Sequence, residues 1–528
     1  MPLQSVIQGV PGIVRKSPDD VLVSGVAYDS RDVSPGNIFV ALKGVVVDGH
    51  NFIQDAIQRG AAAVVGTQAM SELPVPYIQV EDSRQSLAYI SAVLFQYPAR
   101  QLVVIGVTGT DGKTTTANLI FKILRAANVR VGMITTVNAV IGDEVLDTGF
   151  HVTTPEAPDV QYYLARMVQA GLTHVVLEAT SHGLAQHRVT ATDVDIGVLT
   201  NITHEHLDYH GSYEAYREAK ARLFTGLPNS PQKEIPAPVG AVLNRDDSSF
   251  EFLAAATKAP VLTYGVNSPA DVNAENIRQT PGGLRFTALI SRTRENGLRS
   301  GDVRIPLECN LDGEYNVLNC LAAVTTTYKI MQVDKKAVIQ GIKNLQSIPG
   351  RMERISMGQD FISIVDFAHT PNALKNVLES ARSIVVGKQG KGRIIAIFGS
   401  AGLRDKAKRR LMSQVSADLA DLTVLTTEDP RTESLESILS EMAEGVISCG
   451  GEEGKTFWRI PDRREAIRFG ISIAQVGDLV IACGKGHEQS MCFGDVEYDW
   501  DDRVAMRAAL AEHLGIAGPE MPFLPTQE

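Results

Sequence analysis

The chain has few cysteines, no long apolar run and no excess of basic charge, and each shortage excludes a class of protein. Its five cysteines include no C-x-x-C pair, so neither a disulfide framework nor a structural zinc site is indicated. No apolar run approaches the ~18 residues of a membrane-spanning helix. The first residues lack the charged and apolar regions of a signal peptide. We therefore expect a cytoplasmic protein that does not insert into a membrane.

The charge balance limits the choice of partners. A net charge of -11 argues against a protein that binds nucleic acid through a broad basic face, although it leaves room for a local phosphate pocket. The hydrophobic content of 44% and charged content of 21% are typical of globular proteins. A chain of 528 residues exceeds one ordinary core, so we expect several domains.

Apolar, β-rich runs alternate with helical patterns almost throughout, which predicts α/β domains with parallel sheets. The pattern is interrupted at 96–100, before a new strand at 102–106, and again at Pro349-Gly350. These interruptions predict three domains, at residues 1–100, 101–348 and 349–528. The tail beyond Gly515 contains three prolines, and we expect it to be loosely held.

The clearest motif follows the predicted strand 102–106 and reads Gly109-Thr-Asp-Gly-Lys-Thr-Thr-Thr116. A helical pattern comes next, with apolar residues at 119, 120, 123 and 124 on one face. The common G-x-x-x-x-G-K-[ST] form is not met, because Val107 stands where its first glycine belongs. Strand, glycine loop and helix nevertheless form a phosphate cradle, in which backbone N–H groups and the helix N-terminus face the anion. We predict that Lys113 reaches the β/γ-phosphates and that the Thr114 hydroxyl binds Mg²⁺.

A second element of the same site is the apolar run Val175–Glu178, a strand that ends in a carboxylate. Such a carboxylate usually holds Mg²⁺ in nucleotide sites. Three histidines follow at 204, 206 and 210, but their spacing fits a loop, so we favour His206 as a Mg²⁺ ligand over a zinc site. By its pattern alone Lys220, inside the helical segment 212–224, is a solvent-exposed lysine.

Taken in order, these segments resemble the Mur ligases, which form amide bonds in peptidoglycan precursors. The resemblance covers nearly the whole chain. Its N-terminal motifs, at 29–31, 35–36, 39–41 and 48–50, are similar to those of the branch that adds the third amino acid to a UDP-linked dipeptide. The remaining motifs are the phosphate loop, Glu178 with Ser181-His-Gly-Leu184 and Gln186-His-Arg188, His206-Leu-Asp-Tyr-His-Gly211, Gly313–Asn319, Gly350-Arg-Met-Glu353, Asp366–Pro371 and Gly484-Lys-Gly-His-Glu488.

This resemblance implies an α/β fold of three domains. The first would bind the UDP precursor, the central one would be a P-loop-type ATPase domain with a parallel sheet, and the C-terminal one would be Rossmann-like and bind the incoming amino acid. It implies a ligase that converts UDP-N-acetylmuramoyl-L-alanyl-D-glutamate to an acyl phosphate with ATP and Mg²⁺. The acyl phosphate would then react with an amine, which we expect to be meso-2,6-diaminopimelate, with L-lysine or L-ornithine as the alternative. We expect small-molecule substrates only and a monomer.

Two other functions compete with this one. A folylpolyglutamate synthase would share the central and C-terminal domains but lack a UDP-binding first block. A nucleotide-binding partner without ligase activity would not need Lys113, Glu178, His206 and Lys220 intact. Both are therefore less favoured.

The resemblance also implies roles for individual residues. The catalytic residues would be Lys113, Glu178, His206 and Lys220. The ATP site would comprise Gly109, Thr110, Asp111, Gly112, Lys113, Thr114, Thr115, Asn316, Arg351 and Asp366. The UDP-precursor site would comprise Tyr28, Ser30, Thr153, Thr154, Thr180, Gln186 and Arg188. The amino-acid site would comprise Arg404, Glu428, Asp429, Pro430, Arg431, Gly484 and Glu488. The metal ligands would be Thr114, Glu178, His206 and Lys220, the last as a carbamate.

The predicted amino-acid site contains two residues that favour different substrates. Arg431 offers paired donors to a distal carboxylate, which diaminopimelate has and lysine lacks. Asp429 stands where diaminopimelate-adding relatives have asparagine, and its negative charge would favour a basic side chain. Glu428 and Gly484 follow predicted strands, where open α/β sheets bind ligands. We expect Arg404 to contact the ligand and the basic run 406–410 to be a solvated helix end.

Overall fold

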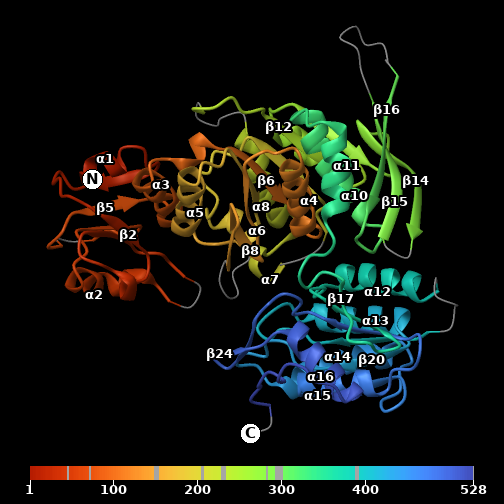
Figure 1. Cartoon of the computed structure of the whole chain (residues 1–528). Helices are drawn as coiled ribbons and strands as arrows, with labels where there is room; N and C mark the ends of the chain where they lie inside the picture. The colour runs from red at the N-terminus through yellow and green to blue at the C-terminus, as the bar shows by residue number, and fades with distance from the viewer. Residues whose placement is uncertain are drawn as a thin grey trace.

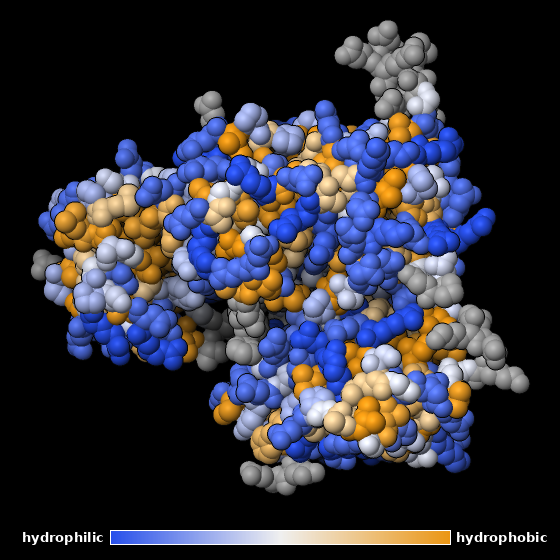
Figure 2. All heavy atoms as spheres, viewed as in Figure 1, coloured by the Kyte–Doolittle hydropathy of each residue, from blue (hydrophilic) through white to orange (hydrophobic). Residues whose placement is uncertain are grey.

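The computed structural model arranges the chain around three sheets, one in each of three successive domains (Figure 1). It describes residues 1–44, 47–70, 73–147, 154–203, 207–227, 233–280, 283–291, 301–386 and 392–526. Polar and charged side chains cover most of the face seen in Figure 2, with apolar ones in small groups. Among the described residues no helix is both long and apolar enough to cross a bilayer.

The first domain is built on a five-stranded sheet of order β1-β5-β4-β3-β2. Strands β2 to β5 are parallel, and β1 pairs with β5 in the antiparallel sense at one edge. Two apolar clusters, one containing Ile38 and Val65 and the other Phe39 and Val64, fill its core. The elements are α1 (Leu3–Ile7), β1 (Ile13–Lys16), β2 (Gly25–Ala27), β3 (Asn37–Val40), α2 (Ile53–Gln58), β4 (Ala63–Gly66), β5 (Tyr77–Val80) and α3 (Ser83–Leu94).

The central domain has an eleven-stranded sheet of order β16-β15-β14-β13-β12-β11-β6-β10-β7-β8-β9. Its middle strands are parallel, as predicted, but antiparallel strands extend it at both edges. The strands are β6 (Val103–Thr108), β7 (Val131–Ile134), β8 (Asn138–Ile141), β9 (Glu144–Asp147), β10 (His174–Glu178), β11 (Ile196–Leu199), β12 (Gly240–Asn244), β13 (Val261–Gly265), β14 (Val272–Thr280), β15 (Gly283–Ile290) and β16 (Val303–Cys309). Strand β6 is buried along its whole length, because helices cover both faces of the sheet here.

The helices of the central domain include the one predicted after the phosphate loop. The apolar positions 119, 120, 123 and 124 of α4 are fully buried, which confirms that face. Helix α10 runs directly into a short π-helix, Thr325–Ile330. The helices are α4 (Lys113–Ala126), α5 (Ala157–Gln169), α6 (Ser181–Ala185), α7 (Leu207–His210), α8 (Tyr213–Thr225), α9 (Phe250–Ala256), α10 (Asn316–Val324) and α11 (Lys335–Asn344).

The third domain has a six-stranded sheet of order β17-β18-β22-β19-β20-β21, in which only β17 is antiparallel to its neighbour. A hairpin, β23 with β24, stands beside it. The strands are β17 (Glu353–Ile355), β18 (Ile362–Asp366), β19 (Ile394–Phe398), β20 (Leu422–Leu425), β21 (Phe457–Arg459), β22 (Leu479–Cys483), β23 (Ser490–Phe493) and β24 (Val496–Asp499). The helices are α12 (Pro371–Val386), α13 (Ala407–Leu419), α14 (Leu435–Ser448), α15 (Arg463–Ser472) and α16 (Asp502–Leu514).

The C-terminal tail is held more firmly than predicted. Leu524 is fully buried in the apolar cluster beneath β18 and β22. The Thr526 hydroxyl donates a hydrogen bond to Asp462 Oδ2 at 2.8 Å. The expectation of a loose tail was wrong for its end, because the apolar Leu524 is buried in the core, whereas residues 515–520 are exposed.

Candidate active site

The phosphate loop lies between the end of β6 and the start of α4, and two of its positions require glycine. The backbone has φ 152° at Gly109 and φ 80° at Gly112. A Cβ atom at Gly109 would collide with the Thr200 hydroxyl, and one at Gly112 with the Asn319 side chain. Glycine therefore allows the loop to pass close to its neighbours while its N–H groups face a ligand.

The next residues of the loop contact groups that the sequence placed in the same site. Lys113 Nζ donates to the Thr110 carbonyl at 2.7 Å, and the Thr114 hydroxyl donates to Glu178 Oε2 at 3.0 Å. Glu178 ends β10, the strand beside β6, so parallel pairing brings its carboxylate to the loop. Its side chain is 2% exposed.

Lys220 is not the solvent-exposed lysine that its helical pattern predicts. It is 1% exposed, and its Nζ donates to the Gly109 carbonyl. The ammonium also lies 4.5 Å from the centre of the Tyr216 ring. The reason is tertiary, because α8 packs with this face against the phosphate loop. Lys220 thus lies at the site where the resemblance places it.

Helix α10 supplies a second support behind the loop. Asn319 accepts a hydrogen bond from the Thr116 hydroxyl at 3.3 Å and donates to Asn316 Oδ1 at 2.9 Å. Asn316 in turn donates to the Asp312 carbonyl at 2.8 Å. Asn316 is 4% exposed, and it lines the same cavity as the phosphate loop.

The third domain presents the ends of its parallel strands to that cavity. Asp366, at the end of β18, accepts from the Met352 and Ala368 N–H groups at 2.6 and 2.7 Å. Burial raises the pKa of Asp366, and the nearby Arg351 opposes that rise. The Arg351 guanidinium lies 4.4 Å from the centre of the Phe367 ring. Its buried Nε has no hydrogen-bond partner among the described residues, so it is available to a ligand.

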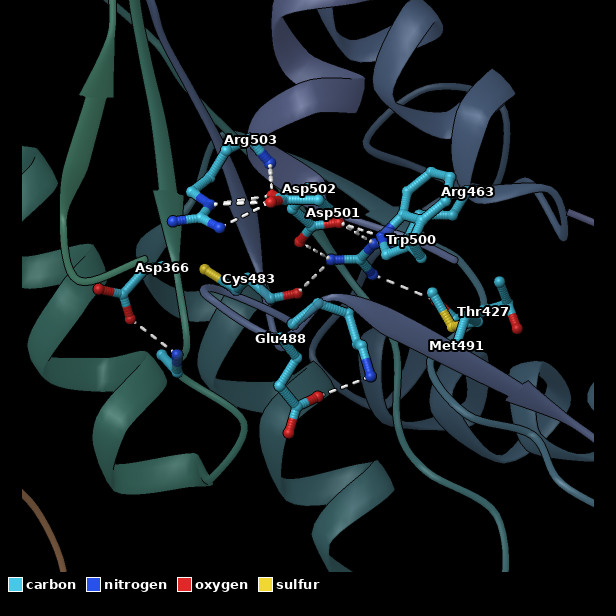
Figure 3. Close-up of polar contacts among 12 residues, drawn as sticks. Asp366, Thr427, Arg463, Cys483, Glu488, Met491, Trp500, Asp501, Asp502 and Arg503 are labelled. Atoms are coloured by element: carbon cyan, nitrogen blue, oxygen red, sulfur yellow. Dashed lines mark hydrogen bonds and ion pairs between the residues drawn. The ribbon is translucent and has the colours of Figure 1, made fainter. Parts of the chain in front are cut away.

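The buried Arg463 hydrogen-bonds to the backbone at the ends of both β20 and β22 (Figure 3). Arg463 is fully buried and forms a bidentate pair with Asp502 at 2.7 and 2.6 Å. It also donates to the carbonyls of Thr427, at 3.1 Å, and Cys483, at 2.8 Å. Trp500 Nε1 donates to the same Asp502 carboxylate at 2.8 Å. Because Thr427 and Cys483 immediately precede Glu428 and Gly484, this network sets the position of both.

Glu428 is a buried carboxylate with an incomplete set of partners. It is 5% exposed, and its Oε2 has no hydrogen-bond partner among the described residues. Burial raises its pKa, while Lys408 and Arg463 act in the opposite direction. A Cβ at Gly484, where φ is 111°, would collide with the Glu428 carboxylate. An unpaired acceptor at a cavity wall is suited to an ammonium ligand.

Asp429 has a buried cationic partner, which the sequence interpretation did not include. Both of its carboxylate oxygens accept from Lys485 Nζ at 3.0 Å. Lys485 is fully buried and also pairs with Glu488 at 2.6 Å. These carboxylates raise the pKa of Lys485, so it stays charged. Arg431 forms no ion pair with any described residue. The argument that Asp429 favours a basic substrate is therefore weakened, because this carboxylate already has a cationic partner.

The basic run after Arg404 is only partly a solvated helix end. Arg409 is fully buried and pairs with Glu433 at 2.7 Å and Glu441 at 3.0 Å. Lys408 lines the cavity. The prediction of a solvated run was wrong for Arg409, because α13 packs one face against α14.

Three of the predicted precursor residues, Thr180, Gln186 and Arg188, line the same cavity. Arg188 donates to the Thr154 carbonyl and to Gln186 Oε1, both at 2.7 Å, and pairs with Glu156 at 2.8 Å. Burial and the Asp159 and Glu156 charges raise the pKa of Tyr28 to about 12. Tyr28 belongs to the first domain, whereas Asp159 and Glu156 belong to the central one.

One cavity of about 1300 Å³ brings most of the predicted residues together. All residues of the predicted ATP site line it, together with Glu178 and Lys220. Nine residues of the other two predicted sites also line it, namely Thr180, Gln186, Arg188, Arg404, Glu428, Asp429, Arg431, Gly484 and Glu488. Four do not, namely Tyr28, Ser30, Thr154 and Pro430. Thr153 and His206 lie outside the described residues. Sequence reasoning missed Lys408, Lys485 and Arg463.

The donor set near the phosphate loop suits a hard cation. The Thr114 hydroxyl and the Glu178 carboxylate provide adjacent oxygen donors, which Mg²⁺ prefers together with substrate phosphates. In the described part of the chain, no three His, Cys, Asp or Glu side chains gather as a metal cage. The residues therefore fit a Mg²⁺ ion that is shared with a nucleotide.

Comparison with known proteins agrees with this fold and cavity. The chain matches the Mur ligase family catalytic domain at residues 22–93, the Mur ligase middle domain at 107–327 and the Mur ligase glutamate ligase domain at 350–486. The chain thus belongs to the Mur ligase family of ATP-dependent amide ligases.

Individual relatives match over nearly the full length. The UDP-N-acetylmuramyl-tripeptide synthetase of Roseiflexus sp. (strain RS-1) is 41% identical, covering 94% of this chain and 96% of the relative. The UDP-N-acetylmuramoyl-L-alanyl-D-glutamate–2,6-diaminopimelate ligase of Geobacillus thermodenitrificans is 39% identical, covering 97% and 100%. A solved structure of a ligase with that same name has 31% identity and a TM-score of 0.62, covering 97% and 99%.

Proposed function

We propose that this chain joins meso-2,6-diaminopimelate to UDP-N-acetylmuramoyl-L-alanyl-D-glutamate and cleaves ATP to ADP and phosphate. The observation that carries the proposal is that the phosphate loop, Arg188 and the strand ends of the third domain all line one cavity. The names of the diaminopimelate ligases to which it is similar support the same reaction.

The chemistry requires activation, because a carboxylate does not react with an amine at neutral pH. The D-glutamate side-chain carboxylate attacks the γ-phosphorus of ATP, ADP leaves, and an acyl phosphate forms. The amine then attacks the acyl carbon, phosphate leaves, and the ammonium proton is released. Lys113 and Arg351 would offset the phosphate charge, and the buried Glu428 would hold an ammonium of the incoming amino acid.

The charge of the amine pocket supports diaminopimelate over lysine or ornithine. Lys485 pairs with both Asp429 and Glu488, and three cationic side chains, Arg404, Lys408 and Arg431, line a rim of the same cavity. A distal carboxylate is complementary to such a rim, whereas a distal ammonium is repelled by it.

The test is phosphate release by purified enzyme with ATP, Mg²⁺ and the UDP-dipeptide. Diaminopimelate, L-lysine and L-ornithine are offered separately, and a Lys113→Ala protein serves as the blank. Turnover with diaminopimelate supports the proposal. Turnover with only lysine or ornithine would overturn the choice of amine, and equal activity of the Lys113→Ala protein would overturn the catalytic assignment.

We further propose that Lys220 is carbamylated and, with Thr114, Glu178 and His206, contributes to a Mg²⁺ site. When bound, the ion would neutralise phosphate charge during transfer. The burial of Lys220 beside the Gly109 carbonyl supports this assignment. A Lys220→Ala protein is expected to lose activity and to regain part of it with short carboxylates in the buffer. Absence of any rescue, in a protein that melts like the parent, would count against the carbamate.

We also propose the limits and roles of the three domains, the oligomeric state and the location of the protein. We place the domain limits at residues 1–100, 101–348 and 349–528, with UDP-precursor, ATP and amino-acid binding in that order. One chain lines the whole cavity, so we propose that it acts as a monomer, in the cytoplasm where its nucleotide substrates occur. Light scattering after size exclusion tests the monomer, and limited proteolysis tests the limits.

A further inference from the structure

Two side chains far apart in the sequence meet between the central and third domains. Asn372 Nδ2 donates a hydrogen bond to Asp111 Oδ2 at 2.9 Å. Asp111 belongs to the phosphate loop, and Asn372 is the second residue of α12. Figure 1 shows α12 on the side of the third domain that faces the central one. The bond therefore crosses the boundary that the cavity spans.

Both partners are held in place by their own domains. The Asp111 N–H donates to Asn201 Oδ1 at 2.9 Å, and its carbonyl accepts from the Thr200 hydroxyl at 2.6 Å. On the other side, the Ala373 N–H donates to the Thr370 hydroxyl at 3.1 Å, which caps the start of α12. Because both backbones are fixed, the side-chain bond reports the relative position of the two domains.

The charge of Asp111 gives this bond a role in the reaction. A carboxylate in a phosphate loop is repelled by a bound triphosphate. An amide donor from the other domain satisfies one carboxylate oxygen and stabilises the charge of Asp111. Closure of the third domain and acceptance of ATP by the loop then favour each other.

A second contact crosses the same domain boundary. Arg354, on β17, pairs with Asp312 at 2.6 Å. The Asp312 carbonyl accepts from Asn316, which leads through Asn319 to Thr116 after the phosphate loop. The third domain is thus tied to the nucleotide site at two separate points, of which Asn372–Asp111 is the one on the loop itself.

We propose that Asn372 is a positioning residue, which holds the third domain against the phosphate loop by donating to Asp111 during amide formation. The proposal rests on the proposed ligase function. It assigns to Asn372 no contact with substrate, and it predicts that the bond matters for the step in which the amine meets the acyl phosphate.

The test exchanges donor and acceptor. Asn372→Asp places two carboxylates against each other and should lower kcat about tenfold, which corresponds to loss of one charge-assisted hydrogen bond. The KM of the UDP-dipeptide should stay within about twofold, because the other two domains hold that substrate. With Mg²⁺ and a non-hydrolysable ATP analogue, X-ray scattering should show a larger radius of gyration than for the parent. The double variant Asp111→Asn/Asn372→Asp restores a donor–acceptor pair and should recover most of the lost kcat and the compact form.

A matched control places the same added charge elsewhere on the same helix. Ser383→Asp adds the same charge to the exposed side of α12, away from the cavity, and should retain the parent kcat. The proposal is overturned if Asn372→Asp keeps both the parent kcat and the parent radius, or if the double variant is slower than Asn372→Asp alone. If the parent turns over none of the amines, the ligase proposal fails separately, and the scattering comparison still decides whether Asn372 holds the domains together.

Discussion

Replacing Lys485 by methionine tests the charge balance of the amine pocket most directly. Lys485 Nζ lies 3.0 Å from both Asp429 oxygens and 2.6 Å from Glu488. At an effective dielectric near 20, a pair at this distance attracts by about 5 kcal/mol. Desolvation offsets part of that attraction, but removing one partner leaves buried carboxylates without a cation, which typically costs about 3–5 kcal/mol.

For a domain of this size, such a loss lowers the melting temperature of the third domain by about 10 °C. Differential scanning calorimetry of the full chain measures it. Lys406→Met is the matched control, because Lys406 is 68% exposed and lies 3.4 Å from Glu433. An exposed pair contributes at most about 1 kcal/mol, so its shift should stay below about 3 °C.

A second substitution shows whether the lost stability comes from an unpaired buried carboxylate or from a loss of packing. Adding Asp429→Asn to Lys485→Met removes the carboxylate that lost its partner and should regain more than half of the lost stability. A Lys485→Met protein that melts within about 3 °C of the parent would refute the charge-balance reasoning. Failure of the second substitution to recover stability would show that packing, and not charge, is lost.

Two further substitutions test individual positions of the cavity. Glu428→Gln should stabilise the third domain at pH 7 and abolish binding of the amine, both measured on the same protein. Burial raises the folded-state pKa of Glu428 above its unfolded value. The penalty for its charge is therefore present at neutral pH and is relieved as pH falls through the folded pKa, so the stabilising effect should shrink on acidification. A constant or growing effect would contradict this. Gly112→Ala should raise the KM for ATP at least about tenfold, because its Cβ collides with Asn319 at positive φ. Gly142→Ala, at φ 65° with open space around it, should leave that KM unchanged, and equal effects of the two would refute the steric argument.

The sequence predicts the parts of this fold that depend on local pattern. The predicted strands at 102–106 and 175–178 correspond to β6 and β10, because a short apolar run in a parallel sheet is buried on both faces. The antiparallel strand β14 was not predicted. Its half-exposed residues show no such run, and its pairing with β15 is set by tertiary context.

Charged residues were the hardest to predict, because their partners are distant in sequence. The pattern around Lys220 and Arg409 indicates an exposed face, yet both are buried by contacts with other elements. The partner of Asp429 lies 56 residues further on, at Lys485. Family motifs place Lys220 in the site. They do not show which side chain pairs with Asp429, and only the structure identifies Lys485 as its partner.

The Arg463 network has a consequence for redesigning the substrate range. This arginine anchors the backbone before Glu428 and Gly484 from the side opposite the cavity. Arg404, Lys408 and Arg431 lie outside that network and contribute side chains to the cavity wall. A library that varies these three positions should therefore change which amine is accepted, while the positions of Glu428 and Gly484 and the stability of the domain are retained.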